Sequence, residues 1–241
     1  MAQYIYGKNM VMQRLNSGKA VGKLFLLEGM KDQNLMQAAK KAKCSVEWLN
    51  RKKLDAMAEG GRHQGVIAEI EEYRTYSLQE ILDKIPYGKL PLLVMLDQLE
   101  DPHNLGAILR TCDAVGADGV IIKKNNSVKL GPTVAKVSTG AIETIPVHEA
   151  VNLTQTLETL KEKGFWVVGA DMDRAVDYRD IQVDVPLLLV IGSEGFGISS
   201  LVKKHCDYMA ALPMIGSVTS LNASVACGIM LYEIYSKRNP R

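Results

Sequence analysis

The first third of the chain alternates short apolar runs with stretches whose apolar residues recur at helical spacing. The apolar runs are short enough for strands, and the spaced stretches are amphipathic, as expected for helices that cover a sheet. Asp32 is a suitable N-cap for one helix, and glycines follow the others. The pattern predicts helices over 7–15, 33–41 and 47–58 and strands over 23–27, 44–46 and 65–70. These residues therefore form a small α/β domain.

From residue 91 onward, strands and helices alternate more regularly. The run 91–96 is almost entirely apolar, which is typical of a parallel strand covered on both faces. The pattern predicts strands over 91–96, 119–122, 165–170, 186–191 and 209–212 and helices over 78–85, 103–115, 132–137, 152–163 and 221–237. Such alternation favours a parallel α/β sheet. With the polar stretch before Ser77 as a linker, we expect domains at 1–72 and 87–241, joined by 73–86.

Two strands of the second domain run into loops rich in glycine and small polar residues. Glycines after a strand let a backbone approach a ligand closely, and the helix that follows offers free N–H donors. The residues are Gly192, Ser193, Glu194, Gly195 and Gly197 in one loop and Gly216, Ser217, Thr219, Ser220, Asn222 and Ser224 in the other. Neither has the spacing of a dinucleotide-binding or triphosphate-binding loop. The alternative is that the glycines form turns and the serines cap helices.

Composition places the chain among globular proteins, with 47% hydrophobic and 23% charged residues. No apolar run is long enough to span a membrane, and the N-terminus lacks the apolar core of a signal peptide. The cysteines lack C-x-x-C spacing and are expected to be free thiols in a reducing compartment: Cys44, Cys112, Cys206 and Cys227. We therefore expect a cytoplasmic protein. The four histidines are scattered, so no metal site is expected.

The net charge of +2 conceals an uneven distribution. Residues 1–90 carry 15 Lys and Arg against 10 Asp and Glu, whereas the remainder carries 14 against 17. The basic side chains of the first part include Lys40, Lys41, Lys43, Arg51, Lys52 and Lys53. Such a surface attracts a phosphate backbone, although a solvated lysine surface without a partner would have the same composition.

A third segment, 96–120, makes the pattern specific. It contains D-P-x-N-x-G-A-I-x-R, and the two loops contain G-S-E-G-x-G and P-M-x-G-x-x-x-S-L-N-x-S-x-A. In this order the three motifs resemble those of the SpoU (TrmH) family of RNA ribose 2′-O-methyltransferases. The matching residues are Asp101, Pro102, Asn104, Gly106 and Arg110; Gly192, Glu194, Gly195 and Gly197; and Pro213, Met214, Gly216, Ser220, Leu221, Asn222, Ser224 and Ala226.

This resemblance implies a fold and a reaction. The fold is a SPOUT-type α/β domain with a parallel sheet and a trefoil knot, preceded by a small L30e-like RNA-binding domain. The knot follows from the resemblance alone, since general rules of topology disfavour knots. The implied reaction is attack by a ribose 2′-hydroxyl on the methyl group of S-adenosyl-L-methionine (AdoMet). The subgroup that the whole chain resembles methylates a guanosine in 23S ribosomal RNA and is usually homodimeric.

The resemblance also implies a site. The catalytic residues would be Arg110, Asn104, Glu194, Ser220 and Asn222. AdoMet would lie against Gly192, Leu212 and Leu221, with Ile215 and Thr139 nearby. The family's arginine is held to activate the 2′-hydroxyl. Because guanidinium rarely loses its proton, a clamp on the adjacent phosphate is an equal alternative, and Glu194 could orient the arginine. Locally, Arg110 also suits a surface ion pair, and the two leucines suit a core.

Three interpretations of function remain at this level. The first is 2′-O-methylation of a 23S rRNA guanosine, and the second is the same reaction on tRNA or another rRNA nucleotide. The third is a non-catalytic RNA-binding protein that has kept the fold, against which the intact motif residues argue. The helix at 221–237 is apolar on more than one face, which a single core would not require and a homodimer would.

Overall fold

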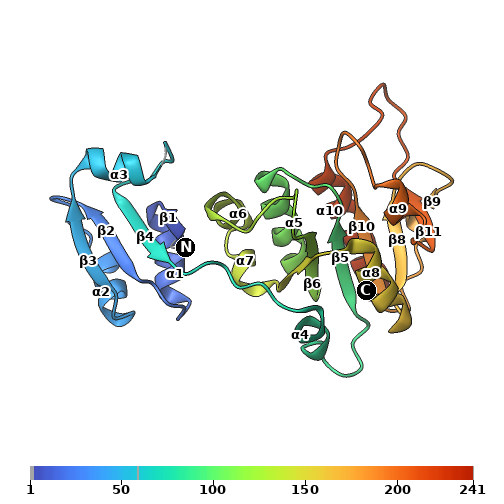
Figure 1. Cartoon of the computed structure of the whole chain (residues 1–241), viewed down its shortest axis with the longest axis horizontal. Coiled ribbons are helices and arrows are strands. Elements are labelled where there is room, and N and C mark those ends of the chain that lie inside the picture. Colours follow the sequence, from blue (N-terminus) through green and yellow to red (C-terminus); the bar gives the residue numbers. More distant parts are fainter. Residues whose placement is uncertain (1–2, 59, 241) are drawn as a thin grey trace. The chain divides into compact units, whose positions relative to one another are not determined.

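The computed structural model describes residues 3–58 and 60–240 and divides the chain into two compact units (Figure 1). The first unit comprises Met1–Tyr73 and Leu130–Gly140, and the second comprises Arg74–Lys129 and Ala141–Arg241. The helix α6 (Pro132–Ser138) thus belongs to the first unit, where the Gln13 side-chain amide donates to the carbonyl of Thr139 at 3.2 Å.

The first unit is built on a four-stranded sheet in the order β1-β4-β2-β3. Its strands are β1 (Gln3–Tyr6), β2 (Lys23–Leu27), β3 (Ser45–Leu49) and β4 (Val66–Ile70). Its helices besides α6 are α1 (Lys8–Asn16), α2 (Gln33–Lys41) and α3 (Arg51–Met57). β4 pairs antiparallel with β1 and β2, whereas β3 joins β2 in parallel. Alternate side chains of the sheet pack against α1 and α2 on one face and against α3 on the other.

The expected helix over 47–58 is wrong in its first three residues. These residues continue β3, which pairs with the whole length of β2, and Asn50 then caps α3 by accepting from the Lys53 N–H at 3.0 Å. Strand pairing along β2 outweighs the local helical pattern. The other elements of this unit lie where the sequence placed them, within a few residues, except β1, which the pattern did not indicate.

The second unit contains a seven-stranded sheet in the order β7-β6-β5-β10-β8-β11-β9, and all of its strand pairs are parallel. Its strands are β5 (Leu92–Leu96), β6 (Gly119–Lys123), β7 (Val147–Ala150), β8 (Trp166–Ala170), β9 (Val176–Asp177), β10 (Leu187–Ile191) and β11 (Tyr208–Ala211). Every residue of β5 and β10 is buried, which confirms the prediction of a parallel sheet covered on both faces.

Helices cover both faces of this sheet. One core joins the sheet to α4 (Leu78–Asp83), α8 (Leu153–Glu162) and α9 (Ser200–Lys203), and on the other face α5 (Pro102–Val115) packs beside α10 (Ala223–Arg238) (Figure 1). Two shorter pieces, α7 (Ala141–Thr144) and the 3₁₀ turn η1 (Tyr178–Asp180), complete the unit. The strand order does not test the trefoil knot, which stays a prediction.

Local signals explain where the helices begin. Ser77 forms a reciprocal capping box with Glu80 at the start of α4, as the sequence predicted for the cap. Asp101 caps α5 by accepting from the His103 N–H at 2.8 Å, Pro102 occupies the first turn, and Gly116 ends the helix in the left-handed conformation. α5 therefore starts directly after the loop that leaves β5, which brings its first turn to the carboxyl end of the sheet.

The C-terminal end of α10 is hydrogen-bonded to the segments that enter the sheet before β5 and β10, at the end of the strands opposite to the first turn of α5. The Arg238 guanidinium donates to the carbonyl groups of Leu90 and Pro91 before β5 and of Val183 and Val185 before β10, at 2.7–3.2 Å. Burial lowers the pKa of Arg238. These bonds satisfy carbonyl groups of two connecting segments with a single side chain.

Candidate active site

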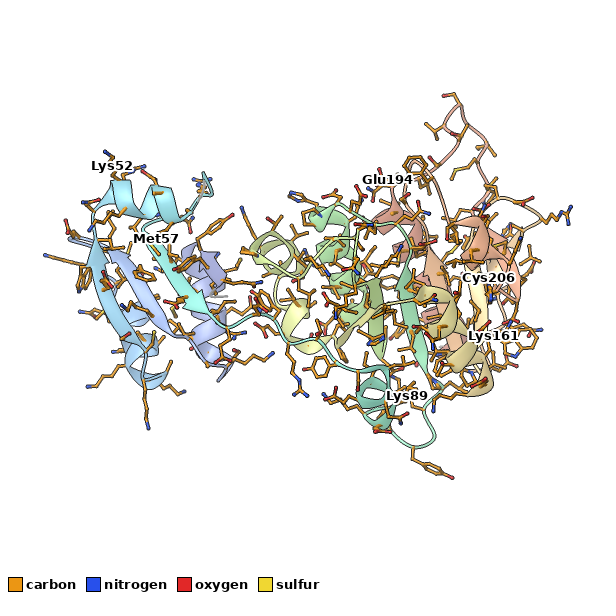
Figure 2. All side chains as sticks on the ribbon, viewed as in Figure 1. Lys52, Met57, Lys89, Lys161, Glu194 and Cys206 are labelled. Carbon is orange, nitrogen blue, oxygen red and sulfur yellow. The ribbon has the colours of Figure 1, made fainter. Side chains whose placement is uncertain are left out.

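The motif residues gather at the carboxyl ends of the central strands. β5, β10 and β8 are neighbours and parallel, so the chain leaves all three at one edge of the sheet. Figure 2 shows Glu194 at this edge, whereas Lys89, which precedes β5, lies at the opposite one. Ligand sites of open α/β sheets form at this edge.

The loop after β10 folds back on itself. Ser193 and Gly197 exchange two backbone hydrogen bonds of 3.1 and 2.8 Å, and Gly197 has a φ of 65°. A Cβ atom on Gly192 would lie only 2.1 Å from the carbonyl carbon of Gly197. Gly192 is therefore required by the packing of the loop against itself, a reason that the sequence did not suggest.

A cavity of about 230 Å³ opens between this loop and the long segment that joins β11 to α10. Its walls include Gly192, Glu194, Leu212, Ser220, Leu221 and Met230. Five residues proposed for the site are thus brought to one cavity. Two residues expected to lie near AdoMet do not line it: the Ile215 side chain is fully exposed, and Thr139 belongs to the first unit. Asn104, Arg110 and Asn222 of the expected catalytic set do not line it either.

Beside the cavity, three side chains from distant parts of the sequence form a hydrogen-bonded cluster. The Asn104 amide nitrogen donates to Glu194 Oε1 at 2.9 Å, and the Asn222 amide nitrogen donates to Asn104 Oδ1 at 2.8 Å and to Glu194 Oε1 at 2.5 Å. Asn222 Oδ1 meanwhile caps α10 by accepting from the Ser224 N–H at 3.0 Å. The cluster therefore joins the first turns of α5 and α10 to the loop after β10.

The sequence suggested that Glu194 orients Arg110, but the two side chains form no hydrogen bond or ion pair. Glu194 Oε1 accepts from the two asparagines and, at 3.4 Å, from the Ala223 N–H. Arg110 is exposed on α5, and among the residues that the structure describes its side chain has no hydrogen-bond or ion-pair partner. The surface ion pair considered for Arg110 is absent in the same described part. The guanidinium is thus free to bind a ligand.

Two carboxylates that the motifs did not single out also support the site. Asp97, which follows β5 and is buried, accepts from the Ser199 N–H at 2.8 Å and so fastens the loop after β10 to β5. Asp171, which follows β8, lines the cavity and pairs with Lys203 at 2.6 Å. Their position one residue beyond an apolar strand was the available signal.

The described residues contain no group of His, Cys, Asp and Glu side chains that could hold a metal ion. The four cysteines are free, and burial raises the pKa of Cys227 to about 12, as it raises that of Cys112 on the neighbouring helix. None of the four lines the cavity, so the thiols do not contribute to its chemistry. No helix in the described part of the chain is long and apolar enough to cross a membrane.

Comparison with known proteins assigns the two parts of the chain. Residues 91–232 match the SpoU rRNA Methylase family, and residues 4–76 match the substrate-binding domain of RNA 2′-O ribose methyltransferases. A protein of Bacillus subtilis (strain 168) assigned to the TrmH family of tRNA/rRNA methyltransferases is 48% identical over 98% of this chain and 96% of its own length. A protein of Staphylococcus haemolyticus with the same assignment is also 48% identical, with the same coverage.

Solved structures agree with these matches. The AdoMet-bound rRNA methyltransferase of Sinorhizobium meliloti superposes with a TM-score of 0.83 at 26% identity, covering 100% of this chain and 88% of that one. The SpoU methyltransferase AviRb of Streptomyces viridochromogenes, in complex with AdoMet, shares the fold with a TM-score of 0.80 at 24% identity, covering 98% and 90%. The motifs, the parallel sheet and these relatives together make the chain a member of the SpoU family of RNA 2′-O-ribose methyltransferases.

Proposed function

We propose that this protein transfers a methyl group from AdoMet to the ribose 2′-hydroxyl of a guanosine in 23S ribosomal RNA. The observation that carries the proposal is the hydrogen-bonded cluster of Asn104, Glu194 and Asn222, which lies at the wall of the cavity between the two glycine-rich segments. The restriction to a 23S rRNA guanosine rests on the resemblance of the whole chain, whereas RNA 2′-O-methylation is the activity of the family.

The cavity suits the cofactor. Ala210, Leu212, Leu221 and Met230 provide an apolar surface for an adenine ring, and the backbone around Gly192 supplies hydrogen-bonding groups. We propose that Gly192, Leu212 and Leu221, which line this cavity, hold AdoMet. AdoMet supplies a methyl group on a sulfonium, which is already a good leaving group.

The chain must then place the ribose oxygen and assist the loss of its proton. Asn104, Ser220 and Asn222 carry short polar side chains suited to holding the ribose or the loops around it. Arg110 is the residue proposed to activate the oxygen. Guanidinium keeps its proton in proteins, so we favour a clamp on the adjacent phosphate that stabilises the developing negative charge.

We propose that the protein is a homodimer that pairs through α10 and α5. Val225, Ile229 and Tyr232 of α10 are exposed by 47, 38 and 51%, although Met230 and Ile234 of the same helix are buried in the core. An apolar face left exposed on a helix that already has a buried face is typical of an interface. Arg110 lies on the surface of α5, the helix that packs beside α10.

We assign RNA capture to residues 1–72 and catalysis to residues 87–241, with 73–86 as the connection. All six basic residues noted in the first part of the chain, from Lys40 to Lys53, are exposed. This surface supports the binding of a phosphate backbone. We place the protein in the cytoplasm, where ribosomal RNA is modified.

The decisive experiment maps 2′-O-methyl groups across total RNA from a strain that lacks this protein. We expect one guanosine of 23S rRNA to lose its methyl group and to regain it on complementation. Loss of a tRNA methyl group would keep the reaction and change the substrate. Calorimetry with purified protein tests the remaining alternative: a non-catalytic RNA-binding protein would not bind AdoMet, and unchanged methylation throughout the RNA would contradict the proposed activity.

A further inference from the structure

A second cavity, of about 490 Å³, lies against the first at the carboxyl end of the sheet. Ser193 and Glu194 line both cavities, and Asn104 of the hydrogen-bonded cluster lines the second. The rest of its wall comes from the segments after β5, β6 and β10. Its volume lies within the range of sites for small organic groups. The second cavity is therefore large enough, and close enough to the shared wall, to take the base of a nucleotide whose ribose is held there.

Three side chains of the wall carry groups that the fold does not use. The Phe196 side chain is 85% exposed, although it lines the cavity. Among the residues that the structure describes, the Glu100 carboxylate and the Lys123 ammonium have no hydrogen-bond or ion-pair partner. The other carboxylates of the wall are engaged: Asp97 with Ser199, Asp101 with His103, and Glu194 with the two asparagines.

The backbone of the wall is also held in an unusual conformation. Gln98 and Asn126, which face the cavity from two different loops, have φ angles of 59° and 52°. Residues other than glycine adopt this region rarely and at an energetic cost, which tends to be met at ligand sites. Both residues carry side-chain amides, which donate and accept hydrogen bonds.

The charge of the wall limits what can enter. Four carboxylates, those of Asp97, Glu100, Asp101 and Glu194, face one ammonium, that of Lys123. This excess of negative charge disfavours a phosphate and favours a ligand with N–H donors on its edge. An exposed aromatic ring beside such an edge is the arrangement by which proteins recognise an unstacked RNA base.

We propose that this cavity is the base pocket for the target nucleotide, with Phe196 stacking on the base and Glu100 selecting guanine. Guanine presents two adjacent donors, N1–H and N2–H, to which a single carboxylate accepts in a bidentate manner. Adenine and the pyrimidines lack this pair. The inference rests on the proposed function, because it presumes that RNA is methylated at a guanosine.

The test of Glu100 uses a transcript of the RNA region around the methylated nucleotide, with guanosine or inosine at that single position. Inosine keeps N1–H and lacks the N2 amino group. Wild-type protein should methylate the guanosine transcript roughly ten-fold or more faster, as kcat/KM, since a hydrogen bond to a charged group is lost. In Glu100→Gln the preference should fall below about three-fold, because the charged acceptor is gone. Glu162→Gln, an exposed substitution on α8, should keep the wild-type preference.

The test of Phe196 measures RNA affinity and AdoMet affinity together. Phe196→Ala should weaken binding of the guanosine transcript by roughly ten-fold or more, and Phe196→Tyr should retain it, because base stacking requires the ring. AdoMet affinity by calorimetry should be unchanged in both variants. Tyr87→Ala, which removes a fully exposed ring before β5, should leave both affinities at the wild-type level.

The outcomes separate this inference from the proposed function. If wild-type protein binds AdoMet and methylates RNA, but Glu100→Gln keeps the full preference for guanosine over inosine, then the base pocket is wrong and the methyltransferase stands. Equal RNA affinity of Phe196→Ala and wild type would overturn the stacking role. If wild-type protein methylates no RNA, the proposed function itself fails. A methylated pyrimidine would keep the reaction and overturn the selection by Glu100.

Discussion

Gly192 and Gly195 lie three residues apart in one motif and have opposite surroundings. A Cβ on Gly192 would collide with the backbone of Gly197 and Ile198 at 2.1–2.3 Å, whereas a Cβ on Gly195 would meet nothing within 4 Å. The same residue type therefore serves two purposes in G-S-E-G-x-G. At Gly192 it permits the loop to close, and at Gly195 it leaves space beside the second cavity.

This difference predicts opposite outcomes for one substitution. Gly192→Ala should lower the free energy of unfolding by about 1–3 kcal/mol, because the added methyl group must displace backbone atoms. It should also weaken AdoMet binding, since the loop forms a wall of the cofactor cavity. Gly195→Ala is the control, and its free energy of unfolding should lie within about 0.5 kcal/mol of the wild-type value. Urea unfolding and calorimetry measure the two effects, and equal stability of the two variants would contradict the assignment.

Arg110 is exposed and has no partner in the described part of the chain, so its removal should cost activity and not stability. Arg110→Ala should lower the rate of methyl transfer by about two to three orders of magnitude and leave AdoMet affinity nearly intact, because the cofactor cavity lies among later residues. Single-turnover assays and calorimetry measure the two quantities. Wild-type turnover by this variant would place the catalytic centre elsewhere.

Arg110→Lys distinguishes the two roles considered for this side chain. A guanidinium that clamps a phosphate through two parallel hydrogen bonds is poorly replaced by lysine at any pH. Proton abstraction predicts a different result: lysine loses its proton more readily than arginine, so rescue should grow as the pH rises through the titration of the lysine. The rate of the variant relative to wild type, followed across pH, decides between them.

At the scale of elements, the sequence predicted most of the second unit because its signals are local. β5 and β10 are unbroken apolar runs that each follow a proline, and α8 begins at the cap Asn152 and is apolar at helical spacing. β7, β9 and α7 were missed because they are only two to four residues long and depend on neighbouring strands or helices. Pairing with β2 likewise extended β3 into a stretch with a helical pattern.

The site was predicted to a similar extent. The motifs brought Gly192, Leu212 and Leu221 to one cavity, and Asn104, Glu194 and Asn222 into one cluster. The sequence could not show which side chains are partners. Glu194 accepts hydrogen bonds from Asn104 and Asn222 and not from Arg110, because Asn104 and Arg110 lie on different faces of α5. The second cavity was also invisible, because three separate loops form it.

The helix α10 has one face in the core and another in solvent, and the exposed face predicts dimerisation. Light scattering at micromolar concentration should give twice the chain mass of 26.5 kDa. Ile229→Glu places a charge in the middle of the exposed face and should shift the protein to a monomer while it unfolds cooperatively, because Ile229 is outside the core. Tyr87→Glu, a charge on an exposed ring elsewhere, should remain a dimer. A fully active wild-type monomer would contradict the proposed interface.

At the scale of the whole molecule, the uneven charge predicts where RNA is held. Lys40 and Lys41 end α2 in the first unit and are exposed. Lys40→Glu with Lys41→Glu should weaken RNA binding, and the dependence of log affinity on log salt should become shallower by about one for each phosphate that is no longer neutralised. AdoMet affinity should not change.

The matched control for these lysines lies in the second unit. Lys163→Glu with Lys204→Glu reverses two exposed charges that also lie at helix C-termini, so the net charge and the effect on helix ends are the same. RNA binding should stay closer to wild type than in the α2 variant. An equal loss of RNA affinity in both variants would mean that binding depends on the total charge and not on the surface of the first unit.

The strand order has a consequence for folding while the chain is being synthesised on the ribosome. β5 pairs on one side with β6, which follows it closely, and on the other side with β10, which comes much later in the chain. All five residues of β5 are apolar and buried in the finished sheet. At typical rates of protein synthesis, the unpaired side of β5 waits for its partner on the order of ten seconds. During that interval the nascent chain exposes an apolar strand with an unpaired edge, and this is the surface that a chaperone would bind first.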